Sequence, residues 1–349
     1  MATISPARIH VEEINQVCIV VKDIQKTVES FWNILGIGPW MIRLLTTDSF
    51  VSHEYCGRPT SATLKVATVQ LGPLEIELTE PIEGDSIYMD WIGKHGEGFH
   101  HLRFFASDVE KTSGVLKELG FPCLQNGTYS TDNRCQFAVF DIKPLRIIWE
   151  VSNARGTSGS NAILYPPGPS PQTKAKLKVK EIPQVAIAVK DIAKIVKNYW
   201  NVLGIGPWEI RDWGSHVQTQ RIYHGKYAWA SEVTSHVFLR DLDLELVQPV
   251  EGESVYQDGI EEHGEGIHHL KFMVDNIEET ASTLAQMGFH SLQGGRIGEP
   301  DAGGGYEYIY IEPLHSMWEP VCAGKGGRPG SPTFYPPELA YSIEKTKNR

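Results

Sequence analysis

The sequence has few cysteines, no long apolar run and no excess of basic residues. Its five cysteines are odd in number and form no CxxC pair, which argues against a disulfide framework and for a reducing compartment. No stretch approaches the roughly 20 apolar residues of a membrane-spanning helix. The first residues contain no apolar segment typical of a signal peptide. We therefore expect a cytoplasmic protein with no membrane partner.

The charge balance bears on the kind of partner. The formal net charge is −11, so most of the surface repels polyanions, and we expect no nucleic-acid partner. Neither a GxGxxG motif after a strand nor a GK[ST] motif is present, so a phosphate-binding loop is not expected. The 349 residues, 41% of them hydrophobic, suffice for two domains of about 150 to 170 residues each.

The chain contains a duplication of a whole domain. INQVCIVVKDIQKTVESFWNILGIGPWMIR returns as IPQVAIAVKDIAKIVKNYWNVLGIGPWEIR, and LEIELTEPIEGDSIYMDWIGKHGEGFHHLRF returns as LDLELVQPVEGESVYQDGIEEHGEGIHHLKF. Matching positions keep an almost constant offset, since 184 − 16 = 168 and 319 − 150 = 169. We expect a first domain at 1–155, a linker rich in Gly, Pro, Ser and Lys at 156–180, a second domain at 181–325 and a C-terminal tail at 326–349.

A shorter repeat lies within each copy. A β-rich run is followed by a helix that begins after an Asp or Asn cap and ends at a glycine, and then by enough β-rich sequence for about three strands. The caps and their glycines are Asp23 and Gly36, Asp108 and Gly120, Asp191 and Gly204, and Asn276 and Gly288. In the second helix we expect Val109, Leu116 and Leu119 to be buried. This pattern predicts an α+β fold in which two strand–helix–three-strand units pair over a concave sheet in each copy.

Four polar residues occupy equivalent strand positions in the paired units of each copy. One opens the first strand of each unit, and one lies in its last strand, so pairing of the units brings all four over the concave face. They are Gln16, Glu77, His101 and Glu150 in copy 1, and Gln184, Glu245, His269 and Glu319 in copy 2. An imidazole, two carboxylates and an amide oxygen suit Zn, Mn, Co, Ni or Mg. Ordinary ion pairs would explain one such residue, but recurrence in two copies favours a divalent-metal site.

These motifs resemble the vicinal oxygen chelate superfamily, which includes glyoxalase I, methylmalonyl-CoA epimerase, extradiol dioxygenases and bleomycin-resistance proteins. The resemblance rests on the ligand position before VKD, the IEL or LEL strand, the GxxHH strand and the terminal WE. It implies two tandem vicinal-oxygen-chelate domains, each built from two paired βαβββ modules around one metal.

The motifs indicate less specifically which branch of the superfamily the chain resembles. The Gln–Glu–His–Glu set is similar to that of eukaryotic glyoxalase I, but the positions of that enzyme's glutathione-binding Arg and Asn differ. They hold Val20 and Pro81 in copy 1, and Ala188 and Pro249 in copy 2. The segment EPIEGDSIYMDWIGKHGEGFHHL is most similar to methylmalonyl-CoA epimerase, although His is usual there where Gln16 and Gln184 stand. Extradiol dioxygenases need two His and a carboxylate for Fe(II), so ring cleavage is disfavoured.

The resemblance implies proton abstraction next to a metal-bound carbonyl of a small aromatic or acyl-thioester substrate, as in an isomerase, epimerase or lyase. Glu150 and Glu319 are the expected bases. Arg103 and Lys271, two residues past the ligand His, face the same cavity. Each either binds a substrate oxygen or pairs with the glutamates and takes the place of the metal.

Three alternatives stay open: a glutathione-dependent lyase, a non-catalytic binding protein of the bleomycin-resistance type, and one catalytic copy beside a structural one. We expect a monomer or homodimer. His100 and His268 are expected on the opposite face in a structural role. Glu232 and His236 are additional acid–base candidates found only in copy 2.

Overall fold

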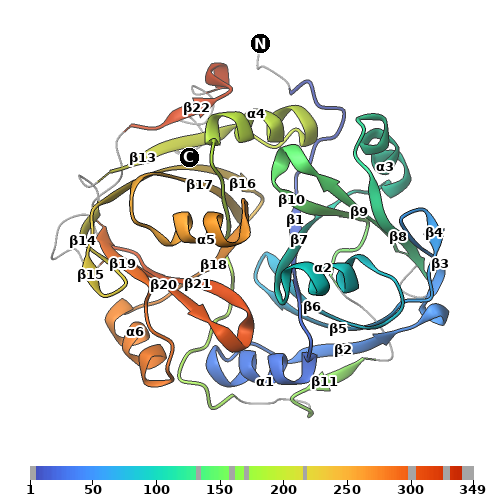
Figure 1. Cartoon of the computed structure of the whole chain (residues 1–349), viewed down its shortest axis with the longest axis horizontal. Coiled ribbons are helices and arrows are strands. Elements are labelled where there is room, and N and C mark those ends of the chain that lie inside the picture. Colours follow the sequence, from blue (N-terminus) through green and yellow to red (C-terminus); the bar gives the residue numbers. More distant parts are fainter. Residues whose placement is uncertain are drawn as a thin grey trace.

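The computed structural model describes residues 5–130, 135–156, 162–168, 173–214, 218–297, 304–324 and 331–339. In this part of the chain, two eleven-stranded mixed sheets are formed, one by each copy. Each sheet curves around one short helix, and the longer helices lie on its outer face (Figure 1). The interior of each curved sheet is therefore separate from the core that the outer helices cover.

Copy 1 consists of the two predicted modules with their first strands side by side. The first module is β1 (Ile14–Val20), α1 (Ile24–Ile34), β2 (Trp40–Leu45), β5 (Thr63–Leu71) and β6 (Leu74–Glu83). The second is β7 (Gly98–Phe105), α3 (Val109–Glu118), β8 (Cys123–Tyr129), β9 (Gln136–Ile142) and β10 (Ile147–Ser152). Strand β1 pairs antiparallel with β7 and parallel with β6, and β10 pairs parallel with β7. The four central strands β6, β1, β7 and β10 are thus the first and last strands of the two modules.

Copy 2 repeats this arrangement. Its first module is β12 (Gln184–Ala188), α4 (Ile192–Leu203), β13 (Trp208–Trp213), β16 (Ala230–Leu239) and β17 (Leu242–Gly252). Its second is β18 (Gly266–Met273), α6 (Ile277–Gln286), β19 (Gln293–Ile297), β20 (Gly305–Ile311) and β21 (Ser316–Cys322). The central order β17-β12-β18-β21 matches that of copy 1. The predicted α+β fold with two tandem copies is confirmed.

The helices begin where the sequence predicts. The side chains of the four cap residues accept hydrogen bonds from the first turns of α1, α3, α4 and α6. In α3, Val109 and Leu116 are buried as expected. The prediction that Leu119 is buried is wrong, because its side chain is 46% exposed. Leu119 caps the C-terminus of α3 and lies outside the helix's regular buried face.

Several elements extend each sheet beyond the predicted modules. A hairpin of β3 (Phe50–Tyr55) and β4 (Arg58–Pro59) leaves the first module and pairs with β8 of the second. In copy 2, β14 (Gln218–Tyr223) and β15 (Lys226–Tyr227) do the same on β19. Strand β11 (Ile163–Tyr165), in the expected linker, pairs with β2, and β22 (Thr333–Tyr335), in the expected tail, pairs with β13.

The remaining short elements join these strands. Helices α2 (Ile87–His95) and α5 (Val255–His263) connect the modules and lie inside the curved sheets (Figure 1). The 3-10 turns are η1 (Thr47–Ser49), η3 (Lys143–Leu145), η4 (Glu312–Leu314) and η5 (Pro337–Leu339). None of the helices in the described ranges combines the length and apolar character needed to cross a membrane.

The two copies share one hydrophobic core. Helix α1 packs against η4 of copy 2, and α4 packs against η3 of copy 1. The rings of Phe31 and Trp318 lie 6.0 Å apart, and those of Trp149 and Tyr199 lie 6.1 Å apart. A backbone hydrogen bond of 2.9 Å from Val11 N to Leu203 O adds to this contact. The outer faces of the sheets are thereby buried together, whereas each concave interior belongs to one copy.

Candidate metal centres

In copy 1 the four central strands bring the predicted quartet together. Gln16 comes from β1, Glu77 from β6, His101 from β7 and Glu150 from β10. His101 Nε2 lies 3.5 Å from Glu150 Oε2, and Gln16 Nε2 donates to Glu77 Oε2 over 3.1 Å. Gln16 and His101 are fully buried, and Glu150 is 7% exposed. The four side chains form one buried polar cluster on the concave face.

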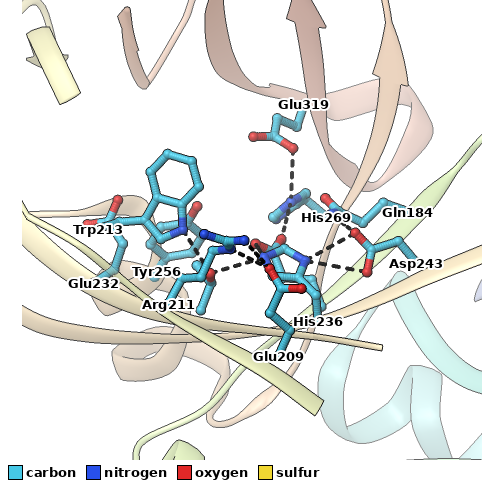
Figure 2. Close-up of polar contacts among 12 residues, drawn as sticks. Gln184, Glu209, Arg211, Trp213, Glu232, His236, Asp243, Tyr256, His269 and Glu319 are labelled. Atoms are coloured by element: carbon cyan, nitrogen blue, oxygen red, sulfur yellow. Dashed lines mark hydrogen bonds and ion pairs between the residues drawn. The ribbon is translucent and has the colours of Figure 1, made fainter. Parts of the chain in front are cut away.

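The second quartet lies at the matching place in copy 2. His269 Nε2 is 3.4 Å from Glu319 Oε2 and 3.6 Å from Glu245 Oε2. Figure 2 shows Gln184 beside His269 in the same cluster. The imidazole of His269 thus faces two carboxylates at short range.

The amide group of each glutamine is oriented by an acidic residue that the sequence analysis missed. Gln16 Nε2 donates to Glu75 Oε1 over 2.7 Å, and Gln184 Nε2 donates to Asp243 Oδ2 over 2.6 Å. Because these carboxylates accept from the amide nitrogen, the amide oxygen is turned away from them. Position alone could have revealed the partners, since each lies two residues before the glutamate of the quartet and shares its face of the strand.

Hydrogen bonding also fixes the tautomer of His269. Burial lowers the pKa of His268 to about 3, so this imidazole is neutral. Its Nε2 donates to the carbonyl oxygen of Val255 over 3.0 Å, which leaves its Nδ1 as an acceptor. His269 Nδ1 lies 3.0 Å from that atom and must be the donor. His269 Nδ1 therefore carries a proton, and its Nε2 faces the carboxylates of Glu245 and Glu319.

Several of these atoms lack any hydrogen-bond partner in the part of the chain that is described. They are Gln16 Oε1 and His101 Nε2 in copy 1, and Gln184 Oε1, His269 Nε2 and Glu319 Oε2 in copy 2. All five are buried, and the three oxygens among them are acceptors whatever the protonation state of the two histidines. Burial and the charge of Glu150 raise the pKa of Glu77, and burial raises that of Glu245. A divalent cation fits both sites, because it would satisfy these atoms and offset the charge of the carboxylates.

The two expected cavity cations differ in their contacts. Arg103 Nε donates to Asn15 Oδ1 over 2.8 Å, and its Nη2 donates to Glu75 Oε1 over 3.2 Å. Arg103 therefore forms its ion pair with Glu75, which is not one of the four quartet residues. Lys271 makes no ion pair within 4.0 Å among the residues described for copy 2. Burial opposes its charge, but Glu319, Glu245 and Asp243 together raise the pKa of Lys271, so it is an ammonium group.

His100 and His268 do not point to the outer face as expected. A register shift in the β1–β7 and β12–β18 pairs lies beside them, and their rings contact the short inner helices instead. The ring of His100 lies 5.1 Å from that of Tyr88, and the ring of His268 lies 5.0 Å from that of Tyr256. Through their Nδ1 atoms they orient the quartet histidines.

The side chains around the two quartets are different. In copy 1, hydrophobic residues fill the interior and form one cluster with α2. In copy 2, polar side chains occupy many of the same strand positions (Figure 2). The copy 1 residues and their copy 2 counterparts are Cys18 and Ala186, Leu64 and Glu232, Thr68 and His236, Phe137 and Tyr306, and Val139 and Tyr308. The ligating atoms of Cys18, His100 and His101 lie within 4.8 Å of one another, so copy 1 adds a buried thiol beside its quartet.

His236 extends the acidic cluster of copy 2. Its Nδ1 lies 3.1 Å from Asp243 Oδ2, and its Nε2 lies 3.6 Å from Glu245 Oε1. Burial opposes its protonation, but Asp243 and Glu245 raise the pKa of His236. Both copy 2 residues that the sequence singled out, Glu232 and His236, lie in the interior of the sheet.

Comparison with protein-family models shows to which family the chain belongs. The model of the glyoxalase/bleomycin resistance protein/dioxygenase superfamily matches residues 15–139 and again 183–308. The chain belongs to this superfamily. Comparison with the sequences of curated proteins gives no significant match.

One solved structure supports this fold, and a second is similar at a lower TM-score. A mutant of 4-hydroxymandelate synthase from Streptomyces coelicolor is similar, with a TM-score of 0.56 and 14% identity over 97% of this chain and 99% of that chain. The 2,3-dioxygenase LapB from Pseudomonas sp. KL28 gives a TM-score of 0.43 and 13% identity over 91% of this chain and 94% of that chain. At 14% identity, the similarity to the synthase concerns the fold alone.

Proposed function

We propose that the protein is a divalent-metal-dependent isomerase, epimerase or lyase that removes a proton next to a carbonyl group of a small substrate. The observation that carries the proposal is the set of buried, unpaired ligand atoms, a glutamine Oε1 and a histidine Nε2 in each copy. Buried polar atoms without partners cost stability, and two sets at equivalent positions favour a shared ligand. The set favours metal ligation over a purely structural network.

The ligands in this proposal are Gln16, Glu77, His101 and Glu150 in copy 1, and Gln184, Glu245, His269 and Glu319 in copy 2. A bound divalent ion would supply Lewis acidity, which lowers the pKa of a C–H next to a carbonyl. Every other part of the reaction falls to side chains of the cavity.

Glu319 is the base that we propose for copy 2, and Glu150 for copy 1. Tyr308 OH donates to Glu319 Oε1 over 2.6 Å, while Oε2 lies 3.4 Å from His269 Nε2 and makes no hydrogen bond in the described part of copy 2. Burial opposes ionisation, but Lys271, His269 and the Tyr308 hydrogen bond together hold the pKa of Glu319 below its ordinary value. An ionised carboxylate with one oxygen outside any hydrogen bond in the described residues suits proton abstraction.

Lys271 has a complementary role in this proposal. It is a buried ammonium group that makes no ion pair within 4.0 Å in the part of copy 2 that is described, and Glu319, Glu245 and Asp243 hold it charged. Negative charge that develops on the substrate oxygen would be stabilised by such a cation in a cavity of low dielectric constant. Arg103 is committed to Asn15 and Glu75, so we assign it to positioning Gln16 through Glu75.

Return of the proton to carbon completes an epimerisation or isomerisation. In copy 2 the hydroxyl groups of Tyr256 and Tyr308 lie 2.5 Å apart, and Tyr308 donates to Glu319. These contacts keep the carboxylate in place while it carries the proton. Loss of a leaving group from the same carbanion would give a lyase instead.

The test is deuterium exchange in D₂O, measured by NMR on a panel of ketones, 2-oxo acids and acyl thioesters. We expect metal-dependent exchange that a double variant, Glu150→Gln with Glu319→Gln, abolishes. Exchange that survives in this variant would overturn the assignment of the bases. Oxygen uptake in place of exchange would favour a dioxygenase, and turnover of methylglyoxal only with glutathione would favour a glyoxalase I-like lyase. Ligand binding without any turnover would favour a binding protein.

A further inference from the structure

A buried thiol lies beside the histidine pair of copy 1. Cys18 is on β1, where it pairs across the sheet with His101 of β7. The Sγ atom of Cys18 and one ring nitrogen each of His100 and His101 all lie within 4.8 Å of one another. Cys18 and His101 are fully buried, and His100 is 3% exposed. A thiol and two imidazoles therefore share one small space that is shielded from water.

The hydrogen bonds of this group are incomplete. His100 Nδ1 lies 2.8 Å from His101 Nδ1, so one of these atoms donates and the other accepts. Neither Nε2 atom makes a hydrogen bond in the described part of copy 1. For two neutral rings, one Nε2 atom is then left with an unused lone pair and the other with an unused proton. The thiol of Cys18 donates only a long hydrogen bond of 3.7 Å to Thr79 Oγ1, and sulfur is a weak donor.

Copy 2 lacks both the thiol and the free histidine. Ala186 stands in place of Cys18, since 186 − 18 = 168. His268, the counterpart of His100, donates from Nε2 to the carbonyl oxygen of Val255 over 3.0 Å. A backbone carbonyl thus satisfies in copy 2 the nitrogen that has no partner among the described residues of copy 1.

One further exchange accompanies this difference. Trp91 of copy 1 matches Gly259 of copy 2, since 259 − 91 = 168. The ring of Trp91 lies 4.9 Å from that of His100, whereas a Cβ atom at Gly259 would lie only 3.1 Å from His268 Cδ2. The indole therefore takes space that copy 2 leaves to its histidine.

The surroundings of the thiol suit a soft metal ion. Cys18 belongs to the hydrophobic cluster between the curved sheet and α2, together with Val20, Tyr88 and Val139. A thiolate selects thiophilic ions, and imidazoles suit the same ions. Zinc at about 2.0 Å from nitrogen and about 2.3 Å from sulfur holds neighbouring ligand atoms roughly 3.3 to 3.6 Å apart. Atoms already within 4.8 Å of one another reach that spacing through small side-chain rotations.

We propose that Cys18, His100 and His101 bind a thiophilic metal ion, such as Zn²⁺ or Cu⁺, in copy 1. The ion takes the place of the thiol proton, as it does when metals bind cysteine. Glu150 Oε2 lies 3.5 Å from His101 Nε2 and would stabilise the ion through this imidazole. Because a neutral imidazole has a single lone pair, His101 serves either this site or the quartet of copy 1. The inference goes beyond the proposed function, since it concerns the metal of copy 1 and requires no turnover.

The test is the absorption spectrum of the full chain loaded with Co²⁺, whose bond to a thiolate gives a charge-transfer band in the near ultraviolet. We expect the intensity of one thiolate ligand per chain in the wild type and no band in Cys18→Ala, which only introduces the residue of copy 2. The control Cys123→Ala removes a thiol of the same copy outside the site and should keep the band. Absence of the band in the wild type, or its survival in Cys18→Ala, would overturn the site.

A pair of histidine variants tests the other ligands. His100→Ala should raise the Co²⁺ concentration at half-maximal charge-transfer absorption by about 100-fold or more. The matched variant His268→Ala changes the same position of copy 2 and should leave that concentration unchanged. An equal effect of both variants, or no effect of either, would contradict His100 as a ligand.

X-ray absorption of the wild type loaded with Zn²⁺ needs no variant. We expect a sulfur neighbour at about 2.3 Å from zinc. A zinc shell of nitrogen and oxygen alone would overturn the proposal. Failure of deuterium exchange with the cobalt band and the sulfur neighbour intact would count against the proposed chemistry alone.

Discussion

The two copies have the same quartet and different interiors. In copy 1, hydrophobic side chains such as Leu64, Phe137 and Val139 surround the quartet. In copy 2, the matching positions hold Glu232, Tyr306 and Tyr308, all buried and hydrogen-bonded. The central strands that hold the quartet are thus alike in both copies, while the lining that a substrate would meet has diverged. A duplicated site of this kind can keep one chemistry and change what it recognises.

The difference extends to the contacts of the quartet itself. Glu319 is held by Tyr308, whereas Val139 stands in that place beside Glu150 and cannot hydrogen-bond. His268 is anchored to Val255 O, whereas His100 Nε2 has no partner in the described part of copy 1. Lys271 forms no ion pair within 4.0 Å with the residues described for copy 2, while Arg103 is bound to Glu75. Each of these differences favours copy 2 as the more active site.

Removing the bases one at a time gives the largest expected effect. We expect Glu319→Gln to lower the rate of deuterium exchange by about 10³-fold, the range of general-base catalysis, because an amide cannot accept the proton. Glu150→Gln should lower the total rate far less if copy 2 is the more active. The measurement is exchange by NMR under saturating metal. A larger loss in Glu150→Gln would reverse the order of the copies.

Metal content tests whether the shared quartets are equivalent. Elemental analysis should give about two divalent ions per chain in the wild type and about one in either His101→Ala or His269→Ala. Loss of an outer partner of a metal ligand weakens binding by about 10- to 100-fold, so loss of the ligand should exceed about 100-fold. We expect this loss because the Nε2 atoms of His101 and His269, which make no hydrogen bond in the described residues, would bind the metal. A full two ions in both variants would contradict the quartet as a metal site.

The Tyr308 hydroxyl gives a smaller effect. Tyr308→Phe removes the hydrogen bond to Glu319 Oε1, worth about 1.5 to 3 kcal/mol for a charged acceptor, and should lower kcat at least about tenfold. The matched control is Tyr310→Phe on the same strand, since Tyr310 is 43% exposed. Steady-state kinetics on the best exchange substrate would measure both. Equal rates in the two variants would show that the hydroxyl does not hold the carboxylate in a productive position.

Sequence reasoning reached the quartet because its signal is local and repeated. Each ligand lies in the first or last strand of a module at a recognisable motif, and the nearly constant offset between the copies pairs every residue with its counterpart. The helices could be placed for the same reason, since a cap such as Asp23 and a buried face such as Ile24, Val28 and Phe31 lie within a few turns. Pairing of modules then followed from the need to cover a concave face.

The remaining features depend on contacts between distant segments. The β3–β4 hairpin pairs with β8, about 70 residues later in the chain, and no local sequence pattern predicts this pairing. The two contacts of Gln293 Oε1 arise only because Arg221 Nη2 and Val255 N meet it from two other elements. Asp243 and Glu75 could have been predicted from the sequence, because each shares a strand face with a predicted ligand. Lys271 lies near enough to Glu319, Glu245 and Asp243 for their charges to raise its pKa, but that it forms no ion pair with the described residues depends on side-chain geometry.

His53 of copy 1 and Arg221, at the matching position of copy 2, give the smallest and most specific prediction. Burial lowers the pKa of His53 to about 4, against about 6.5 in an unfolded chain, so the folded state favours the neutral ring. Its contribution to stability is present above pH 6.5 and is lost as the pH falls towards 4, because only the unfolded state then takes up the proton. Arg221 keeps its charge and adds no such dependence in copy 2. Between pH 6.5 and pH 5.5, the free energy of unfolding measured with urea should therefore fall by about 1 kcal/mol more in the wild type than in His53→Gln. Parallel curves for the two proteins would mean that His53 is protonated in the folded state, so that its Nε2, 3.1 Å from Gln125 Nε2, could not accept a hydrogen bond from that amide.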